Sequence, residues 1–207
     1  LSGKNITVTA ADSFSAQNSQ LLAGIQPDGT IAKSGNLKLD TANVNLTSSN
    51  LQAVEELTVN TDRLSTDSST IITAEKASLQ GTQTLNGQIN ASDSLAFVGK
   101  NVTVSGTALV KANSLTTHLE DNLSIDGNIE ANQANVISSA LNISDSGKLS
   151  VRNNLNVTAS ETLNNSGSIQ SGAEAVITSA RLDQNGALIS QGALVLNLQQ
   201  SSLTGLT

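Results

Sequence analysis

Few residues in this sequence could take part in acid–base chemistry. The single histidine, His118, is followed by Glu120 and Asp121, and a hydrolase could use such a set as a base with a carboxylate partner. No nucleophile stands at a spacing that would complete the site, and a histidine beside carboxylates in a predicted turn is more often solvated. The adjacent Glu55 and Glu56 would point to opposite faces of a strand and make a poor acid–base pair. We therefore assign no catalytic residue.

The sequence also lacks the residue patterns of metal and redox sites. It contains no cysteine, which excludes disulfides, thiolate zinc sites and cysteine nucleophiles. Arg63, Arg152 and Arg181 are far apart in the chain. The aspartates scatter rather than recur at one repeat position: Asp40, Asp62, Asp67, Asp93, Asp126, Asp145 and Asp183. We expect no bound metal and no cofactor.

Composition narrows the class of protein. Of the 207 residues, 37% are hydrophobic but only 1% are aromatic, so the interior must be filled by Leu, Ile, Val and Ala, which requires a narrow, regular core. The net charge of −7 would repel nucleic acid and anionic lipid. No apolar run approaches the ~18 residues of a membrane-spanning helix, so we expect no insertion into a membrane. The start at Leu1, without Met or a signal peptide, favours an internal piece of a longer polypeptide.

An internal repeat organises the chain. An aliphatic residue that has Gly, Ser or Thr two positions before it recurs every 18 to 20 residues. The residue two positions after it mostly has a short side chain. These predicted anchors are Ile31, Leu51, Ile71, Ile89, Leu109, Ile129, Leu149, Ile169 and Leu188.

Each repeat contains three short apolar clusters with the alternation of a β-strand. In the repeat that begins at Ile31, for example, the second is Leu37 with Leu39, and the third is Val44 with Leu46. No segment has the periodicity of an amphipathic helix. The pattern predicts an all-β, right-handed parallel β-helix over residues 1–207, with coils of about 20 residues, each stacked on the one before.

One segment, residues 15–32, is longer than a regular coil allows. It delays the next anchor by about eleven residues and includes the only proline of the chain, in a Pro-Asp-Gly turn. We predict a β-hairpin that projects from the rod, and insertions in solenoids often carry recognition. Its possible contact residues are Leu21, Leu22, Ile25, Gln26, Pro27, Asp28 and Gly29.

These repeats resemble those of filamentous haemagglutinins. The resemblance is carried by residues 123–131 (LSIDGNIEA) and 163–171 (LNNSGSIQS), and residues 21–30 are similar to a recurring insertion of that family. It implies a secreted, non-enzymatic exoprotein of two-partner secretion, exported through an outer-membrane transporter and displayed on the surface of a Gram-negative bacterium. Such filaments act as adhesins or in contact-dependent inhibition, and carry a distal binding or toxin module toward a receptor on a host or neighbouring cell.

Three functions remain open on the sequence alone. The first is a monomeric rod that serves as a structural and adhesive filament segment. The second is a β-helix enzyme that cleaves polysaccharides, although the chain has only Phe14 and Phe97 to offer as aromatic sugar platforms. The third makes this segment itself the receptor-binding region, with the predicted hairpin as its contact element.

Overall fold

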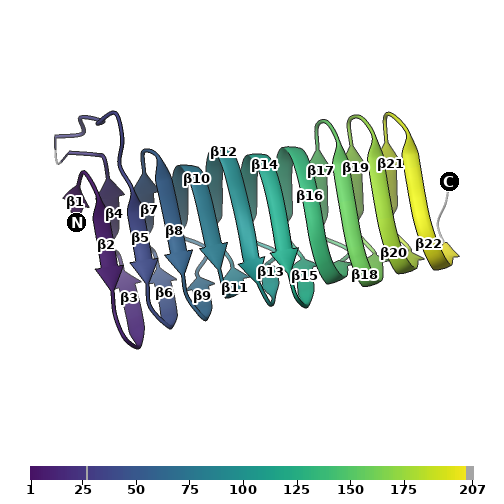
Figure 1. Cartoon of the computed structure of the whole chain (residues 1–207), viewed down its shortest axis with the longest axis horizontal. Helices are drawn as coiled ribbons and strands as arrows, with labels where there is room; N and C mark the ends of the chain where they lie inside the picture. The colour runs from purple at the N-terminus through teal and green to yellow at the C-terminus, as the bar shows by residue number, and fades with distance from the viewer. Residues whose placement is uncertain (27, 204–207) are drawn as a thin grey trace.

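The chain folds as a parallel β-solenoid, as the repeat predicted. The structure is a computed structural model that describes residues 1–26 and 28–203. Its strands stack in parallel into about ten turns of roughly 20 residues, and these described residues include no helix (Figure 1). The three strands of each turn form three faces, here called A, B and C in chain order.

Face A is built from the first strand of each turn. Six strands lie on it alone: β1 (Ser2–Gly3), β4 (Gln20–Ala23), β7 (Asn50–Ala53), β17 (Lys148–Val151), β19 (Ser168–Ser171) and β21 (Ala187–Ser190). Three longer strands run from face A onto face B: β10 (Ile71–Gln80), β12 (Gln88–Gly99) and β14 (Leu109–Leu119). β16 (Asn128–Ile143) crosses all three faces.

Faces B and C complete each turn. Face B also contains β2 (Ile6–Thr9), β5 (Leu37–Asp40) and β8 (Glu56–Asn60). Face C contains β3 (Ser13–Gln17), β6 (Asn43–Thr47), β9 (Arg63–Thr66), β11 (Thr82–Leu85), β13 (Val102–Val104) and β15 (Asn122–Ile125). Three strands run from B onto C: β18 (Leu155–Asn165), β20 (Ala175–Gln184) and β22 (Leu194–Leu203).

Stacked aliphatic side chains form one continuous core. On face B, for example, Leu37, Leu57 and Ala77 lie on successive coils and are all buried. Phe97, one of the two aromatic residues, is fully buried in this core. Since each side chain contacts mainly its counterparts in the coils on either side, the stability is that of a solenoid, in which several turns stabilise one another.

Three of the predicted anchors are wrong. Ile31 lies outside the rod and is 68% exposed, whereas Leu21 occupies the inward position, paired with Leu51. In two later coils the inward residue is one position further on, at Ile72 and Val110. A shift of one residue moves a side chain to the opposite face of a strand, and both positions were aliphatic in these coils, so composition could not distinguish them.

The extra residues leave the rod later than predicted. Ala23 pairs with Ala53, and Leu37 pairs with Leu57. Leu37 comes fourteen positions after Ala23, whereas Leu57 comes four positions after Ala53, so the second coil contains ten extra residues. We call residues 25–34 the excursion, drawn at the upper left of Figure 1. The predicted boundaries of 15–32 are therefore wrong. Gln20–Ala23 is a regular strand of face A, because its alternating side chains complete the core of the second coil.

Where face A meets face B, the chain of the middle coils bends without leaving the strand. β10, β12 and β14 pass through this bend as continuous strands, and the register between coils shifts there, as between Ala91 and Ser94. A shift of this kind is a bulge that bends a strand and redirects its side chains. The excursion emerges at this same bend, in the second coil.

Candidate functional site

A groove runs along the bend between faces A and B, parallel to the axis of the rod. Each of eight successive coils contributes residues from a stretch of three consecutive positions, which we call a rung; the last coil contributes Ile189 and Gln191. The rungs are 52–54, 73–75, 90–92, 111–113, 130–132, 150–152, 170–172 and 189–191. Seven strand spacings separate the first rung from the last, which makes the groove roughly 33 Å long.

The groove is continuous. It consists of two hollows of about 530 and 720 Å³ that share Lys111, Ala112 and Asn132. The exposed side chain of Ile31 lines the first hollow, so the excursion lies at that end of the groove. Each volume lies within the ~300–1,000 Å³ typical of ligand sites.

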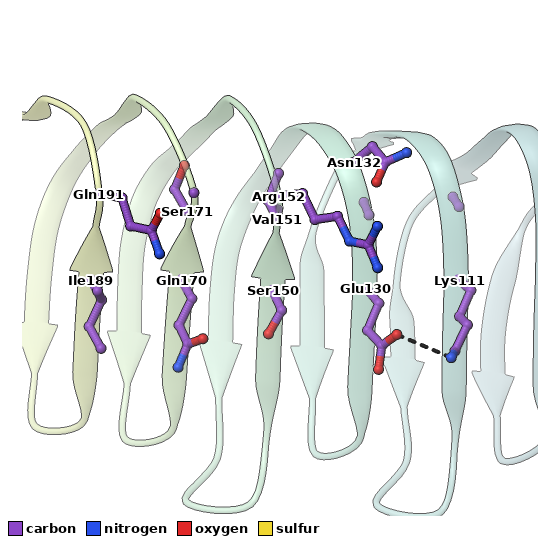
Figure 2. A pocket seen from close by; sticks show the side chains of 13 residues that line it. Lys111, Glu130, Asn132, Ser150, Val151, Arg152, Gln170, Ser171, Ile189 and Gln191 are labelled. Atoms are coloured by element: carbon purple, nitrogen blue, oxygen red, sulfur yellow. Dashed lines mark ion pairs between the residues drawn. The ribbon is translucent and has the colours of Figure 1, made fainter.

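Two rows of side chains form the walls of the larger hollow. In Figure 2 Lys111, Glu130, Ser150, Gln170 and Ile189 form one row, and Asn132, Arg152 and Gln191 form the other. The middle residue of a rung is alanine in five coils, serine in two and valine in one, and six of the eight are buried, so the backbone lies at the floor between the rows.

Most residues at the floor are small, because the chain bends there over a narrow core. Ala53, Ala74 and Ala131 are all buried at this position. In two late coils a serine takes their place, and its hydroxyl adds a hydrogen bond to carbonyl groups at the bend that already accept a backbone N–H. Ser171 Oγ donates to the carbonyl of Asn153 at 2.7 Å, and Ser190 Oγ donates to that of Ala173 at 2.6 Å.

The walls are held by polar contacts between rungs. Asn132 Nδ2 donates to Asn113 Oδ1 at 2.7 Å, and Lys111 Nζ lies 3.2 Å from Glu130 Oε2. Both charged side chains are about half exposed, so the ion pair contributes little to stability. It does neutralise both charges where the two hollows meet.

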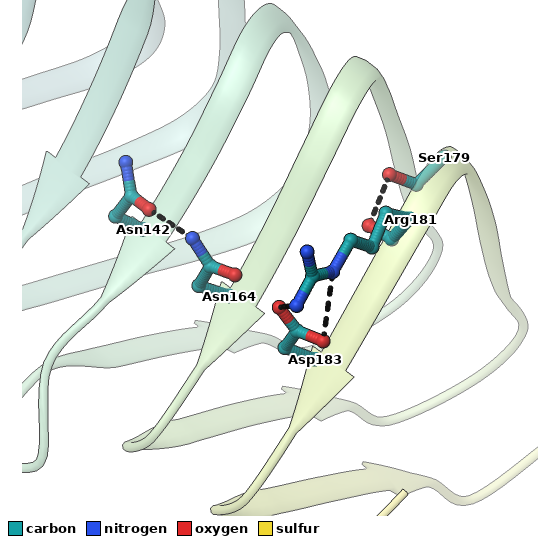
Figure 3. A network of polar contacts seen from close by, with 5 residues as sticks. All are labelled: Asn142, Asn164, Ser179, Arg181 and Asp183. Carbon is teal, nitrogen blue, oxygen red and sulfur yellow. Dashed lines mark hydrogen bonds and ion pairs between the residues drawn. The ribbon is translucent and has the colours of Figure 1, made fainter. Parts of the chain in front are cut away.

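Face C carries a different polar surface (Figure 3). Asn164 Nδ2 donates to Asn142 Oδ1 at 2.7 Å, and one carboxylate, Asp183, holds Arg181 with both oxygens, at 3.1 Å from Nε and 2.8 Å from the terminal nitrogen. Arg181 is thus occupied within its own strand. Arg152, by contrast, lines the groove.

The structure disperses the residues predicted to form a contact hairpin. Leu21 is buried in the core, and Leu22 is half-buried on the outer side of β4. Ile25 is buried and forms an antiparallel bridge with Ile31. Three of the predicted residues are exposed at the tip: Gln26, Asp28 and Gly29. Pro27 lies outside the described residues.

Backbone and side-chain hydrogen bonds shape this tip. The Gly29 N–H donates to the Gln26 carbonyl at 2.9 Å, and the Thr30 N–H donates to Asp28 Oδ1 at 2.9 Å. The second bond stabilises the carboxylate and lowers the pKa of Asp28 below its ordinary value of 3.8.

The residues considered for acid–base chemistry lie apart from the groove. His118 is exposed on the outer side of face B, beside Val98 and Ile137. Asp121, in the following turn, accepts a hydrogen bond of 3.3 Å from Asn101 Nδ2. Glu55 and Glu56 are exposed where β8 begins.

Residues 1–26 and 28–203 lack two kinds of functional feature. They contain no cluster of three His, Asp or Glu side chains able to hold a metal ion. They also contain no helix with the length and hydropathy needed to cross a bilayer.

Comparison with known proteins gives one result. The family described as Haemagglutinin repeat matches residues 1–26. These residues cover the first coil and β4, and together with the β-solenoid the match fits repeats of the filamentous haemagglutinin type. No curated protein and no solved structure matches the chain.

Sequence reasoning did not find the groove. Its signal is present in the sequence as a short residue flanked by two mostly polar ones at the end of each face A strand, as in Asn90-Ala91-Ser92 or Glu130-Ala131-Asn132. With Ile71 and Ile31 taken as anchors, the positions two residues later became Thr73 and Lys33, and the regular series of small residues was hidden.

Proposed function

We propose that this chain is a rod-forming segment of a secreted bacterial surface filament. The observation that carries the proposal is the solenoid itself, whose cross-section repeats over about ten turns. A stack of this kind gains length with each added coil and needs no new core design, which suits a protein that must reach away from a cell. The Haemagglutinin repeat match at residues 1–26 supports the same role.

The finer assignment follows the resemblance of the repeats. The filament would leave the cell through an outer-membrane transporter of two-partner secretion and remain on the outer surface. It would act as an adhesin or in contact-dependent inhibition, and present a distal binding or toxin module to a receptor on a host or neighbouring cell. The segment itself would act as a monomeric rod without inserting into membranes or binding nucleic acid.

A non-catalytic role also accords with the geometry of the groove. Its two carboxylates, Glu75 and Glu130, lie three coils apart, which corresponds to about 14 Å. A pair of glycosidase carboxylates is separated by ~5–9.5 Å. In addition, Glu130 is paired with Lys111. We therefore prefer a structural role to the alternative of a polysaccharide-cleaving enzyme.

Localisation of the chain in the cells that produce it tests the proposal. An epitope tag inserted at Gly29, where the backbone is exposed and a glycine Cβ would meet open space, should leave the rod intact. We expect antibody to label the tag on intact cells by electron microscopy, and added protease to remove the label. A label that appears only after lysis, in the cytoplasmic fraction, would overturn the proposal.

A further inference from the structure

We propose that the groove between faces A and B binds a neutral, straight glycan chain of 1,4-linked β-hexopyranose units, which lies parallel to the axis of the rod. The inference is independent of the filament role, because it rests on the shape and chemistry of the groove in this segment alone.

The repeat of the groove favours a polymer. Equivalent side chains recur once per coil, and coils are spaced by about 4.7–4.9 Å. A ligand that contacts several rungs in the same way must itself repeat at nearly that distance. A pyranose unit in an extended β-1,4-linked chain advances by slightly more than one strand spacing and is turned over relative to the unit before it. Such a chain is straight, so each rung meets one sugar, and the same edge of the sugar returns at every second rung.

An extended peptide fits less well. It advances by about 3.2–3.4 Å per residue, so its side chains would fall out of step with the rungs. Peptides also bind sheets by adding a strand to a free edge. Below the middle rungs the strands have no such edge, because β12 pairs with β10 on one side and β14 on the other, and β14 pairs in turn with β16. Among the described strands of face A, β21 at the last rung pairs on one side alone, with β19.

The wall chemistry matches hydroxyl groups. Amide and hydroxyl side chains, which both donate and accept hydrogen bonds, line the groove on every rung from 52–54 to 189–191. They include Gln52, Thr73, Asn90, Ser92, Asn113, Asn132, Ser150, Gln170 and Gln191. Val54 and Ile189 add apolar surface for the carbon faces of sugar rings.

The charges of the groove favour a neutral ligand. Two acidic and two basic side chains line it: Glu75, Glu130, Lys111 and Arg152. Lys111 and Glu130 compensate each other at 3.2 Å. The chain as a whole has a net charge of −7. A polyanion such as a sulfated glycan would therefore gain little binding energy in the groove and would be repelled by the rest of the rod.

Binding of defined oligosaccharides to the chain tests the proposal. Cellohexaose is the probe, and maltohexaose, which has the same sugar in a curled α-1,4 chain, is the matched control. Titration calorimetry or ligand-observed NMR should show binding of cellohexaose at least tenfold tighter than that of maltohexaose or cellobiose. Absence of cellohexaose binding, equal binding of maltohexaose, or binding of heparin alone would each overturn the proposal.

Paired variants locate the site. Asn132→Ala with Gln170→Ala removes wall amides from two rungs, and we expect it to weaken cellohexaose binding at least tenfold. The control, Asn135→Ala with Asn156→Ala, removes two exposed, neighbouring amides from face B and should leave binding unchanged. Thermal unfolding confirms that both proteins are folded. Binding that survives the groove substitutions, or that falls equally in both variants, would place the ligand elsewhere and overturn the proposal.

Discussion

Gly24 and Gly35, eleven positions apart in the sequence, touch at the base of the excursion: a Cβ atom on Gly35 would collide with the backbone of Gly24. On either side of them the rod is regular. The Ala23 carbonyl accepts the Val54 N–H at 3.1 Å, and the Gly35 carbonyl accepts the Glu55 N–H at 3.0 Å. The excursion is therefore an insertion whose two ends already meet, with the next coil paired below both.

We expect that residues 25–34 can be deleted without loss of the fold. Joining Gly24 to Gly35 leaves four positions between Ala23 and Leu37, the same as between their partners Ala53 and Leu57. The unfolding free energy, measured by denaturant titration, should change by no more than about 1 kcal/mol, because the deletion removes few core contacts.

A second deletion of equal length is the control. Removing residues 20–29 eliminates β4 and, with it, the buried side chains of Leu21 and Ala23. We expect severe destabilisation, visible as loss of the cooperative transition or of β circular dichroism. If the two deletions behave alike, residues 25–34 are not a separable insertion.

Substitution of Gly35 by alanine should be costly in its own right. The new methyl group would press on the backbone of Gly24, which cannot move aside like a flexible side chain, and Gly24 itself has a positive φ of 78°. We expect a loss of about 1–3 kcal/mol in unfolding free energy. The matched substitution is Gly106→Ala, whose Cβ would meet only the Asp126 carbonyl at 3.8 Å, and it should change stability by less than about 0.5 kcal/mol.

The sequence predicts the solenoid well because its evidence is repeated. A buried residue such as Leu57 is ambiguous alone, but it recurs in register with Leu37 and the same spacing returns in each later coil. Local register is predicted less well, since Ile71 and Ile72 are equally apolar and only pairing with Leu51 decides which one points inward. The groove depends on which residue of each face A strand points inward. It also depends on the bend between faces A and B, which arises from packing between coils and therefore cannot be recognised in a single coil.

Buried Gln83 interrupts an otherwise apolar column. It lies between Leu64 and Val102 on neighbouring coils, and its Nε2 donates to the Leu79 carbonyl at 2.7 Å. Its Oε1 is buried and has no hydrogen-bond partner among residues 1–26 and 28–203. A buried acceptor without a partner costs about 1–3 kcal/mol, more than a typical neutral hydrogen bond contributes.

We therefore expect Gln83→Leu to stabilise the rod, by about 1 kcal/mol in unfolding free energy. Gln80→Leu is the control, because Gln80 is half-buried beside the same turn and should respond by less than about 0.5 kcal/mol. Destabilisation by Gln83→Leu would mean that the bond to the Leu79 carbonyl outweighs the lone acceptor.

Two half-buried aspartates, Asp67 and Asp40, make the unfolding free energy depend on pH, each for a different physical reason. Asp67 accepts the Ser48 N–H at 2.9 Å and the Thr70 hydroxyl at 2.7 Å, and these bonds lower its pKa below the ordinary 3.8. The pKa of Asp40 is lowered by Lys38, whose Nζ lies 3.0 Å from its carboxylate, through hydrogen bonding and charge.

Both groups should favour the folded state at neutral pH. Since each pKa is lower in the folded chain than in the unfolded one, the contribution is fully present above the unfolded value and is lost as the pH falls through the folded value. Asp67→Asn should therefore flatten the decline of stability below about pH 4, as measured by denaturant titration at a series of pH values. A decline as steep as that of the parent chain would show that Asp67 does not contribute.

Salt separates the two causes. The charge of Lys38 is exposed and is screened at high ionic strength, because the Debye length falls to about 3 Å at 1 M salt. The hydrogen bond from the Ser48 N–H to Asp67 is short, and its donor carries no net charge, so salt should affect it little. In an NMR titration of the side-chain carboxyl carbons, added salt should therefore raise the pKa of Asp40 toward 3.8 and leave that of Asp67 nearly unchanged. Lys38→Met should raise the pKa of Asp40 at low salt. An equal response of both carboxyls to salt would contradict the assignment of the Asp67 shift to the hydrogen bonds from Ser48 and Thr70.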